Sequence, residues 1–120
     1  MCVILCCDLE LVEPRSEVFI DDYFVESERE FVRSALSGAA RDLRTNLVWC
    51  AKESALKVVR QGLRRDTRSV VATIRGAEAA DDWSGLSVLD LTSARTIGGW
   101  WRVTDGFVEV VTVLEEADPR

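Results

Sequence analysis

Trp49 to Lys57, W-C-A-K-E-S-A-L-K, is the stretch that decides the fold of this 120-residue chain. It lies in a longer segment, from about Ala39 to Gly62, in which apolar residues recur at the spacing of one helix face. A glycine just beyond the last periodic residue is a common helix stop. The sequence therefore predicts a long central helix against which the rest of the chain packs. Its predicted buried residues are Leu43, Leu47, Val48, Ala51, Ala55, Val58 and Val59.

The same helix carries charged side chains that allow two interpretations. Trp49, Glu53 and Lys57 follow each other at i, i+4 and i+8, and Lys52 is next to Glu53. A Glu and a Lys four residues apart are an ordinary stabilising pair, and a Trp usually supplies apolar area. Alternatively, the two lysines and Glu53 form a polar face that looks into solvent or into a site. The choice depends on whether another acidic pair meets this face.

Such a pair lies at the end of the first predicted strand. The apolar run Val3 to Cys7 is typical of a strand that is buried on both faces. In an extended segment Asp8 and Glu10 project from the same side, and Leu9 projects from the other. Neighbouring carboxylates are mutually unfavourable unless water, a cation or a basic group neutralises them. The pair is therefore either a solubilising strand end or part of a magnesium site, because Mg²⁺ prefers oxygen ligands.

Two shorter helices are predicted between this strand and the central helix. Residues 16–23 form a short helix or turn, and Ser27 with Glu30 fits a capping box at the start of the next helix. Gly38 is the predicted end of that helix.

Beyond the central helix the hydrophobic period changes from about 3.6 to 2, which predicts strands. Asp105-Gly106 is a strong signal for a type I′ hairpin turn. The order of one strand, helices and then several strands predicts an α+β fold, with helices packed on one face of a mostly antiparallel sheet. The later predicted strands are 68–75, 86–91, 101–104 and 107–114.

Composition limits the class of protein. The length is near the commonest single-domain size, and 48% apolar residues suffice for one core, so residues 1–120 are expected to form a single domain. No apolar run approaches the roughly 18 residues that span a bilayer, and the start lacks the basic leader of a secretory signal. The expected location is cytoplasmic. Four cysteines without Cys-x-x-Cys spacing and without any histidine are expected to be reduced, mostly buried thiols rather than zinc ligands.

The net charge of −6 makes the surface as a whole a poor match for nucleic acid. Arg60, Arg64, Arg65 and Arg68 nevertheless form a local basic patch after the central helix. This patch is either a solvated helix end, where cations suit the helix dipole, or an anion-binding surface.

Two motifs together resemble a known family. C-D-L-E at 7–10 is followed about forty residues later by W-C-A-K-E-S-A-L-K and then Gly62-Leu63. In order and spacing they are similar to the 4′-phosphopantetheinyl transferases, especially the surfactin-synthetase-activating type, over about residues 4–74. That family has a strand ending in G-x-D-x-E and a helix reading W-x-x-K-E-x-x-x-K.

The resemblance implies a magnesium-dependent holo-[acyl-carrier-protein] synthase. Such an enzyme moves the phosphopantetheine arm of coenzyme A to a serine of an acyl or peptidyl carrier protein in fatty acid or polyketide biosynthesis. By position, Asp8, Glu10 and Glu53 match the metal ligands, and Glu53 also matches the proposed base for the serine. Lys52 and Lys57 match the lysines that contact the phosphates, and Lys57 is also carried over as catalytic.

The chain departs from the family pattern in two ways. Cys6 stands where the family has glycine, and the sequence resembles only the second of the two similar halves of the surfactin type. The missing half implies a homo-oligomer, a complementary half-domain, or a domain cut from a larger chain such as a polyketide synthase. The alternative function is a non-catalytic half-domain that serves as a docking or assembly module.

Overall fold

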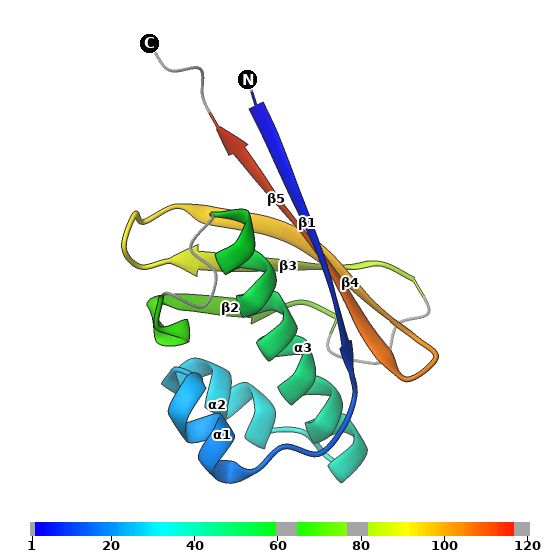
Figure 1. Cartoon of the computed structure of the whole chain (residues 1–120). Helices are drawn as coiled ribbons and strands as arrows, with labels where there is room; N and C mark the ends of the chain where they lie inside the picture. Colours follow the sequence, from blue (N-terminus) through cyan, green and yellow to red (C-terminus); the bar gives the residue numbers. More distant parts are fainter. Residues whose placement is uncertain (1, 60–64, 77–81, 117–120) are drawn as a thin grey trace.

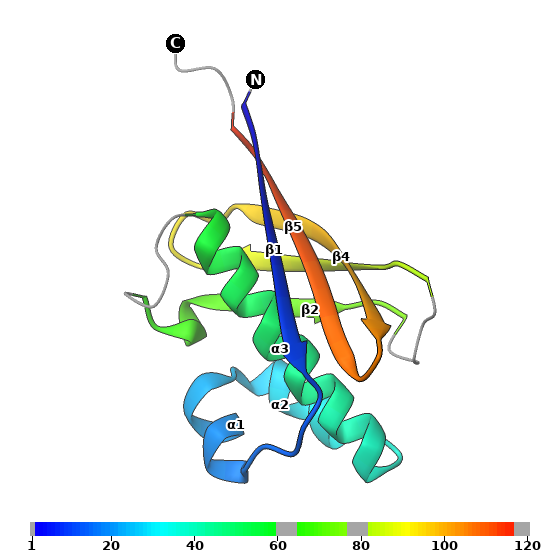
Figure 2. The same ribbon diagram turned by 45° about the vertical axis from the view of Figure 1, so that its right-hand side comes forward.

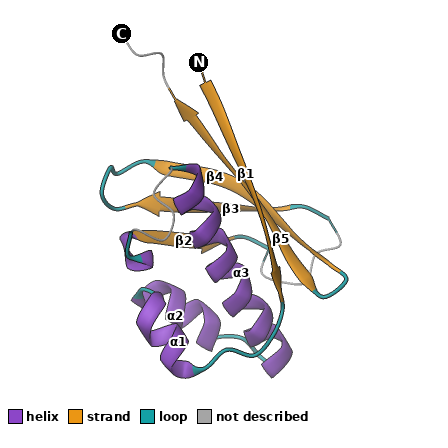
Figure 3. Cartoon of the chain, viewed as in Figure 1, coloured by secondary structure: helices purple, strands orange, loops and turns teal. Residues whose placement is uncertain are grey.

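The computed structural model describes residues 2–59, 65–76 and 82–116. Within them, three α-helices and a short 3-10 helix pack with a five-stranded sheet whose strand order is β1-β5-β4-β3-β2 (Figures 1 and 3). Every neighbouring pair of strands is antiparallel, which confirms the predicted α+β fold. The elements are β1 (Cys2–Leu11), α1 (Glu17–Tyr23), α2 (Glu26–Arg33), α3 (Gly38–Val58), η2 (Thr67–Ser69), β2 (Val70–Ile74), β3 (Ser84–Asp90), β4 (Thr96–Thr104) and β5 (Phe107–Glu116).

The predicted central helix is α3, which lies across one face of the sheet with α1 and α2 beside its first half (Figure 2). It begins at Gly38, so the prediction that this glycine closes the preceding helix is wrong. The Ser37 hydroxyl accepts a hydrogen bond from the Ala40 N–H at 3.1 Å, which makes Ser37 the N-cap. The predicted stop, Gly62, lies outside the described residues.

Of the two short helices, the first begins where the sequence predicts, and the second does not. The helix predicted over 16–23 is confirmed, and the Ser16 hydroxyl caps it by accepting from the Phe19 N–H. The second helix starts at Glu26 rather than after Ser27. The backbone N–H of its N-cap residue, Val25, donates to the Glu28 carboxylate at 2.9 Å. Because Glu28 makes this bond from inside the protein, tertiary packing selects a start two residues earlier than a Ser27 cap would give.

The predicted hairpin joins β4 to β5. Asp105 and Gly106 have φ of 52° and 79°, the left-handed conformation that a type I′ turn requires at both central positions. Strand β4 starts at Thr96, five residues before the predicted start, because Gly98 and Gly99 continue the ladder opposite Val113 and Thr112.

Strand β1 lies at the edge of the sheet, which contradicts the prediction of a strand buried on both faces. It pairs only with β5, and the helices cover only one of its two faces. Val3, Leu5, Leu9 and Leu11 point to the other face and are exposed. A continuous apolar run does not distinguish a strand covered on both sides from one with an open apolar face.

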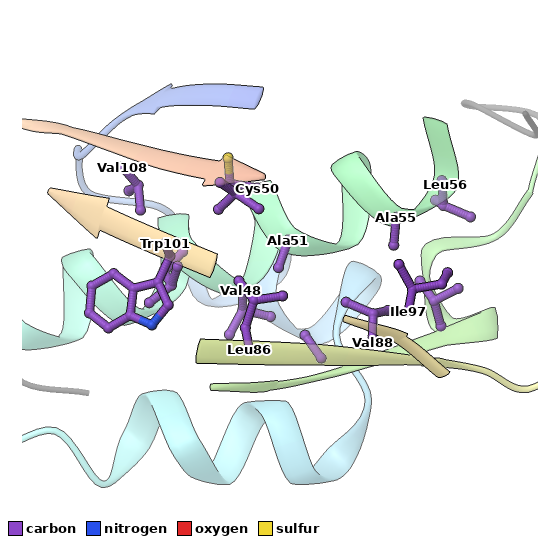
Figure 4. Packing of buried hydrophobic residues seen from close by; sticks show 14 of the residues in the cluster. Val48, Cys50, Ala51, Ala55, Leu56, Leu86, Val88, Ile97, Trp101 and Val108 are labelled. Atoms are coloured by element: carbon purple, nitrogen blue, oxygen red, sulfur yellow. The ribbon is translucent and has the colours of Figure 1, made fainter. Parts of the chain in front are cut away.

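The core lies between α3 and the sheet. Figure 4 shows Val48, Ala51 and Ala55 of α3 directed toward the buried side chains of β3 and β4, which include Val88 and Trp101. Small residues in the middle of the helix allow the sheet to approach closely. The Trp101 indole N–H donates to the Arg75 carbonyl at 2.9 Å, so this large residue is buried without leaving a polar group unpaired.

The cysteines are free thiols where the structure describes their side chains. Cys50 is buried and Cys6 is half-buried, whereas Cys7 is exposed on the opposite face of β1, so the expectation of mostly buried thiols is wrong for Cys7. No helix in the described ranges is long and apolar enough to cross a membrane.

Candidate functional site

The side chain of Asp8 meets the end of the central helix. Asp8 and Glu10 point to the same side of β1, as predicted, and α3 covers that side. The Lys57 ammonium donates to Asp8 Oδ1 at 3.0 Å, and this bond raises the pKa of Lys57. Asp8 is only 15% exposed, whereas Lys57 is half exposed. The other oxygen, Asp8 Oδ2, is buried and has no hydrogen-bond partner among the residues described.

Glu10 is held by a cation that the sequence analysis missed. The Arg15 guanidinium donates to Glu10 Oε1 at 2.7 Å and to Asn46 Oδ1 of α3 at 3.1 Å. It also lies 5.0 Å from the centre of the Phe19 ring. These contacts fasten the segment after β1 to α1 and α3. The only signal in the sequence was one arginine five residues after Glu10, which no motif distinguishes.

Glu53 faces the same carboxylates from α3. Burial raises its pKa, and the negative charges of Asp8 and Glu10 raise it further, while Lys57 and Arg15 act in the opposite direction. The charges of these two carboxylates and two cations therefore act on Glu53 through space. The structure joins Lys57 to Asp8 directly, and it places Glu10 and Glu53 within electrostatic range of this pair; these are four of the five predicted site residues.

A short polar contact holds this part of α3 against the sheet. The hydroxyl groups of Ser54 and Thr112 of β5 lie 2.7 Å apart, and the Ser54 hydroxyl donates to the Cys6 carbonyl at 3.2 Å. Because Ser54 follows Glu53 directly, this contact sets the rotation of α3 about its axis. It directs Glu53 and Lys57 toward the edge of the sheet where Asp8 lies.

Lys52 lies elsewhere, and its predicted place on the exposed polar face is wrong. Its side chain is fully buried, and its ammonium donates to Glu28 Oε1 of α2 at 2.5 Å. Glu28 Oε2 accepts from the Ala72 N–H of β2 at 2.7 Å. Neighbouring helix residues point about 100° apart, so Lys52 joins α3 to α2 and β2 while Glu53 faces the site.

Trp49 extends the site as an aromatic wall. Its ring packs against the rings of Phe19 and Tyr23, with centroids 5.0 and 5.2 Å away. It continues the stripe of Glu53 and Lys57 toward α1, so the predicted stripe exists, with an aromatic cluster at one end and charges at the other.

The predicted basic patch lies partly outside the described residues. Arg60 and Arg64 fall there. Arg65 donates two hydrogen bonds to the nearly buried Asp90, at 2.6 and 3.1 Å, and Arg68 pairs with Asp66 at 3.1 Å. The two arginines of the patch that the structure describes, Arg65 and Arg68, are therefore neutralised by carboxylates of the same chain.

The residues of the site fit a magnesium ion in chemistry, although they do not enclose one. Carboxylate oxygens are the donors that Mg²⁺ prefers, and the buried, unpartnered Asp8 Oδ2 has the character of an oxygen kept for a cation. Across the described ranges, no three acidic or other metal-ligating side chains converge closely enough to hold an ion. Lys57 and Arg15 instead neutralise Asp8 and Glu10.

The fold and site define a class of protein: an α+β domain whose central helix brings an acidic and a basic side chain to a carboxylate pair on an edge strand. The family model of the 4′-phosphopantetheinyl transferase superfamily matches residues 5–98. The chain belongs to this superfamily, whose general activity is phosphopantetheinyl transfer, and the predicted resemblance is confirmed. No curated protein matches the chain.

Proposed function

We propose that this chain transfers the 4′-phosphopantetheine arm of coenzyme A to a serine of an acyl or peptidyl carrier protein in a magnesium-dependent reaction. The serine oxygen would form a bond to the β-phosphorus of coenzyme A, and the bond from that phosphorus to the bridging oxygen would break. The products are the modified carrier and 3′,5′-adenosine bisphosphate, which keeps the bridging oxygen. The serine proton would pass to the Glu53 carboxylate, directly or through a water.

The observation that carries the proposal is the contact of Lys57 with Asp8 beside Glu53, in a chain of this superfamily. Asp8, Glu10 and Glu53 are the residues that would hold Mg²⁺. The bound ion would supply neutralisation of the pyrophosphate charge. Lys57 is half exposed and ends the same stripe, so its ammonium can reach a phosphate from solvent.

The phosphate contact of Lys52 stays a prediction. It would require the ammonium to leave Glu28, its partner in the core. We further propose that residues 1–120 act as one phosphopantetheinyl transferase-like domain in the cytoplasm, without nucleic acid or membrane, and that a second copy or a complementary half completes the coenzyme A site.

The alternative proposal is a non-catalytic half-domain that docks or assembles a larger synthase. One observation favours it: Arg15 and Lys57 already neutralise two of the three carboxylates within this chain. Such internal pairing needs no metal and no substrate.

Mass spectrometry of an apo carrier protein tests the two proposals. Incubation with the full chain, coenzyme A and Mg²⁺ should add one phosphopantetheine to the carrier, and Asp8→Asn or Glu53→Gln should abolish the addition. Glu26→Gln is a matched control, because this exposed carboxylate lies in α2 and pairs with Arg29 of its own helix turn. Calorimetry adds a second readout: coenzyme A should bind only with Mg²⁺. Metal-independent carrier binding without any mass gain would favour the docking module.

A further inference from the structure

Arg15 is fixed in place next to the acidic residues of the site. Its guanidinium donates to Glu10 Oε1 at 2.7 Å and to Asn46 Oδ1 at 3.1 Å, and it lies 5.0 Å from the centre of the Phe19 ring. Asn46 is fully buried and its amide donates to the Glu13 carbonyl at 2.7 Å, so the acceptor for Arg15 is itself held firmly. The Arg15 side chain is only 22% exposed. A cation with these partners has little freedom to move when a ligand enters.

Lys57, the other cation of the site, is held much more loosely. Within the described residues its ammonium makes one hydrogen bond, to Asp8 Oδ1 at 3.0 Å, and its side chain is half exposed. A lysine ammonium sits on a flexible four-carbon stem, and a half-exposed ion pair contributes little free energy. Lys57 can therefore exchange Asp8 for another anion. The site thus contains one permanent counter-ion, Arg15, and one exchangeable counter-ion, Lys57.

The two cations nearly balance the charge of the carboxylates. Asp8, Glu10 and Glu53 carry three negative charges when they are ionised. Arg15 and Lys57 act on the same site with two positive charges, so one net negative charge remains. Their hydrogen bonds also occupy one oxygen of Asp8 and one oxygen of Glu10. A divalent cation that enters alone therefore meets few free oxygens and two like charges that repel it.

We propose that Arg15 makes the binding of divalent metal at this site depend on the diphosphate group of the substrate. Because its guanidinium stays on Glu10, the free chain binds Mg²⁺ alone only weakly. Each phosphate of the diphosphate in coenzyme A carries one negative charge, so the group forms a neutral unit with Mg²⁺. Mg²⁺ is usually held by one or two carboxylates together with substrate phosphates, which is the small donor set that Arg15 leaves.

Lys57 responds to the diphosphate in the opposite way from Arg15. Its ammonium leaves Asp8 and donates to a phosphate oxygen, which frees Asp8 Oδ1 beside the buried, unpartnered Oδ2. Metal and diphosphate therefore bind as one unit, and each raises the affinity for the other. The inference rests on the proposed function for the identity of this ligand, and it assigns Arg15 a role in binding selectivity rather than in the chemical step.

Calorimetric titration of Mg²⁺ into the full chain, alone and with coenzyme A, tests this dependence, with Mg²⁺ into coenzyme A as the blank. The wild type should bind Mg²⁺ at least about 10-fold more tightly with coenzyme A. Arg15→Met should bind Mg²⁺ alone about 10-fold more tightly than the wild type, because one repelling charge is lost, and the effect of coenzyme A should shrink. Lys57→Met should change both affinities in the same direction. It alters a half-exposed position, so the test does not depend on the folding of Arg15→Met.

Two further variants separate charge from structure. Arg15→Lys keeps the positive charge, so its affinity for Mg²⁺ alone should stay within about 3-fold of the wild type. If the guanidinium served only to hold the chain in shape, Arg15→Lys and Arg15→Met would have the same metal affinity. Arg33→Met is the matched control, because it also removes one positive charge, from an exposed pair with Asp21, and it should leave both affinities unchanged.

Three results would overturn the inference: equal Mg²⁺ affinity of the wild type with and without coenzyme A, no gain of affinity for Mg²⁺ alone in Arg15→Met and Lys57→Met, or equal behaviour of Arg15→Lys and Arg15→Met. Carrier modification is measured separately. A chain that shows the coupling but does not modify a carrier would refute only the proposed function, whereas transfer without the coupling would refute only the role of Arg15.

Discussion

The buried pair of Lys52 and Glu28 predicts a large loss of stability when either partner is removed. Both side chains are fully buried, so truncating one leaves the other charge in surroundings of low polarity. Such a loss costs about 3 to 5 kcal/mol. This is a large part of the total of about 5 to 15 kcal/mol that typically separates folded from unfolded domains.

The two truncations should differ because they leave different groups unpaired. In Lys52→Met, the Glu28 carboxylate keeps the N–H donors of Val25 and Ala72 at 2.9 and 2.7 Å, so we expect a loss of about 3 kcal/mol. In Glu28→Leu, both N–H groups lose their acceptor, and the ammonium keeps its contact with the Phe24 ring, 5.7 Å away, but no carboxylate of the described residues at ion-pair distance. The expected loss is about 5 kcal/mol or more.

Urea unfolding followed by circular dichroism measures these losses. The double variant Lys52→Met/Glu28→Leu should be less destabilised than the sum of the single variants, since it leaves no unpaired charge. Arg33→Met is a suitable control: its ion pair with Asp21 is half exposed, so its loss should cost less than about 1 kcal/mol. A loss below about 1 kcal/mol for Lys52→Met, or a milder effect of Glu28→Leu, would refute the reasoning.

Two further predictions concern the sheet. The Arg65 guanidinium holds the pKa of Asp90 in the folded protein well below its usual range. The ionised carboxylate therefore stabilises the fold fully above the ordinary Asp pKa of about 3.9, and this stabilisation is lost as the pH falls through the lower pKa of the folded state. Asp90→Asn should therefore cost about 2 kcal/mol at pH 7, and the difference in thermal unfolding should shrink in acid; a constant difference would contradict this. A Cβ atom at Gly99 would collide with the Val111 carbonyl, whereas one at Gly98 meets open space. In denaturant melts Gly99→Ala should cost about 1 to 3 kcal/mol and Gly98→Ala nothing, and equal effects would show that the backbone adjusts.

The candidate site was predictable in part, because periodicity tells which residues share a face. Alternation along an extended strand put Asp8 and Glu10 on one side, and helical spacing put Glu53 and Lys57 on one stripe. The prediction that Lys52 shares this polar face is wrong, because neighbouring residues of a helix, here Lys52 and Glu53, point about 100° apart. Spacing along one helix carries no information about Glu28, which is supplied by a different helix and holds Lys52 in the core.

Arg15 shows a second limit. It reaches Glu10 and Asn46 because the segment after β1 packs against α3, where the Asn46 side chain also donates to the Glu13 carbonyl. No local sequence pattern predicts this packing. From the sequence alone, Arg15 cannot be distinguished from an ordinary surface arginine.

By itself, the sequence determined the α+β class, the central helix, the hairpin at Asp105-Gly106 and the superfamily. These follow from local backbone preferences, hydrophobic period and motif spacing, all of which act over a few residues. Only the tertiary structure decided that β1 is an edge strand with one open apolar face, that Lys52 is a core residue and that Lys57 pairs with Asp8. Each of these depends on which elements pack together, and the free energy of that packing comes from contacts between residues far apart in the chain.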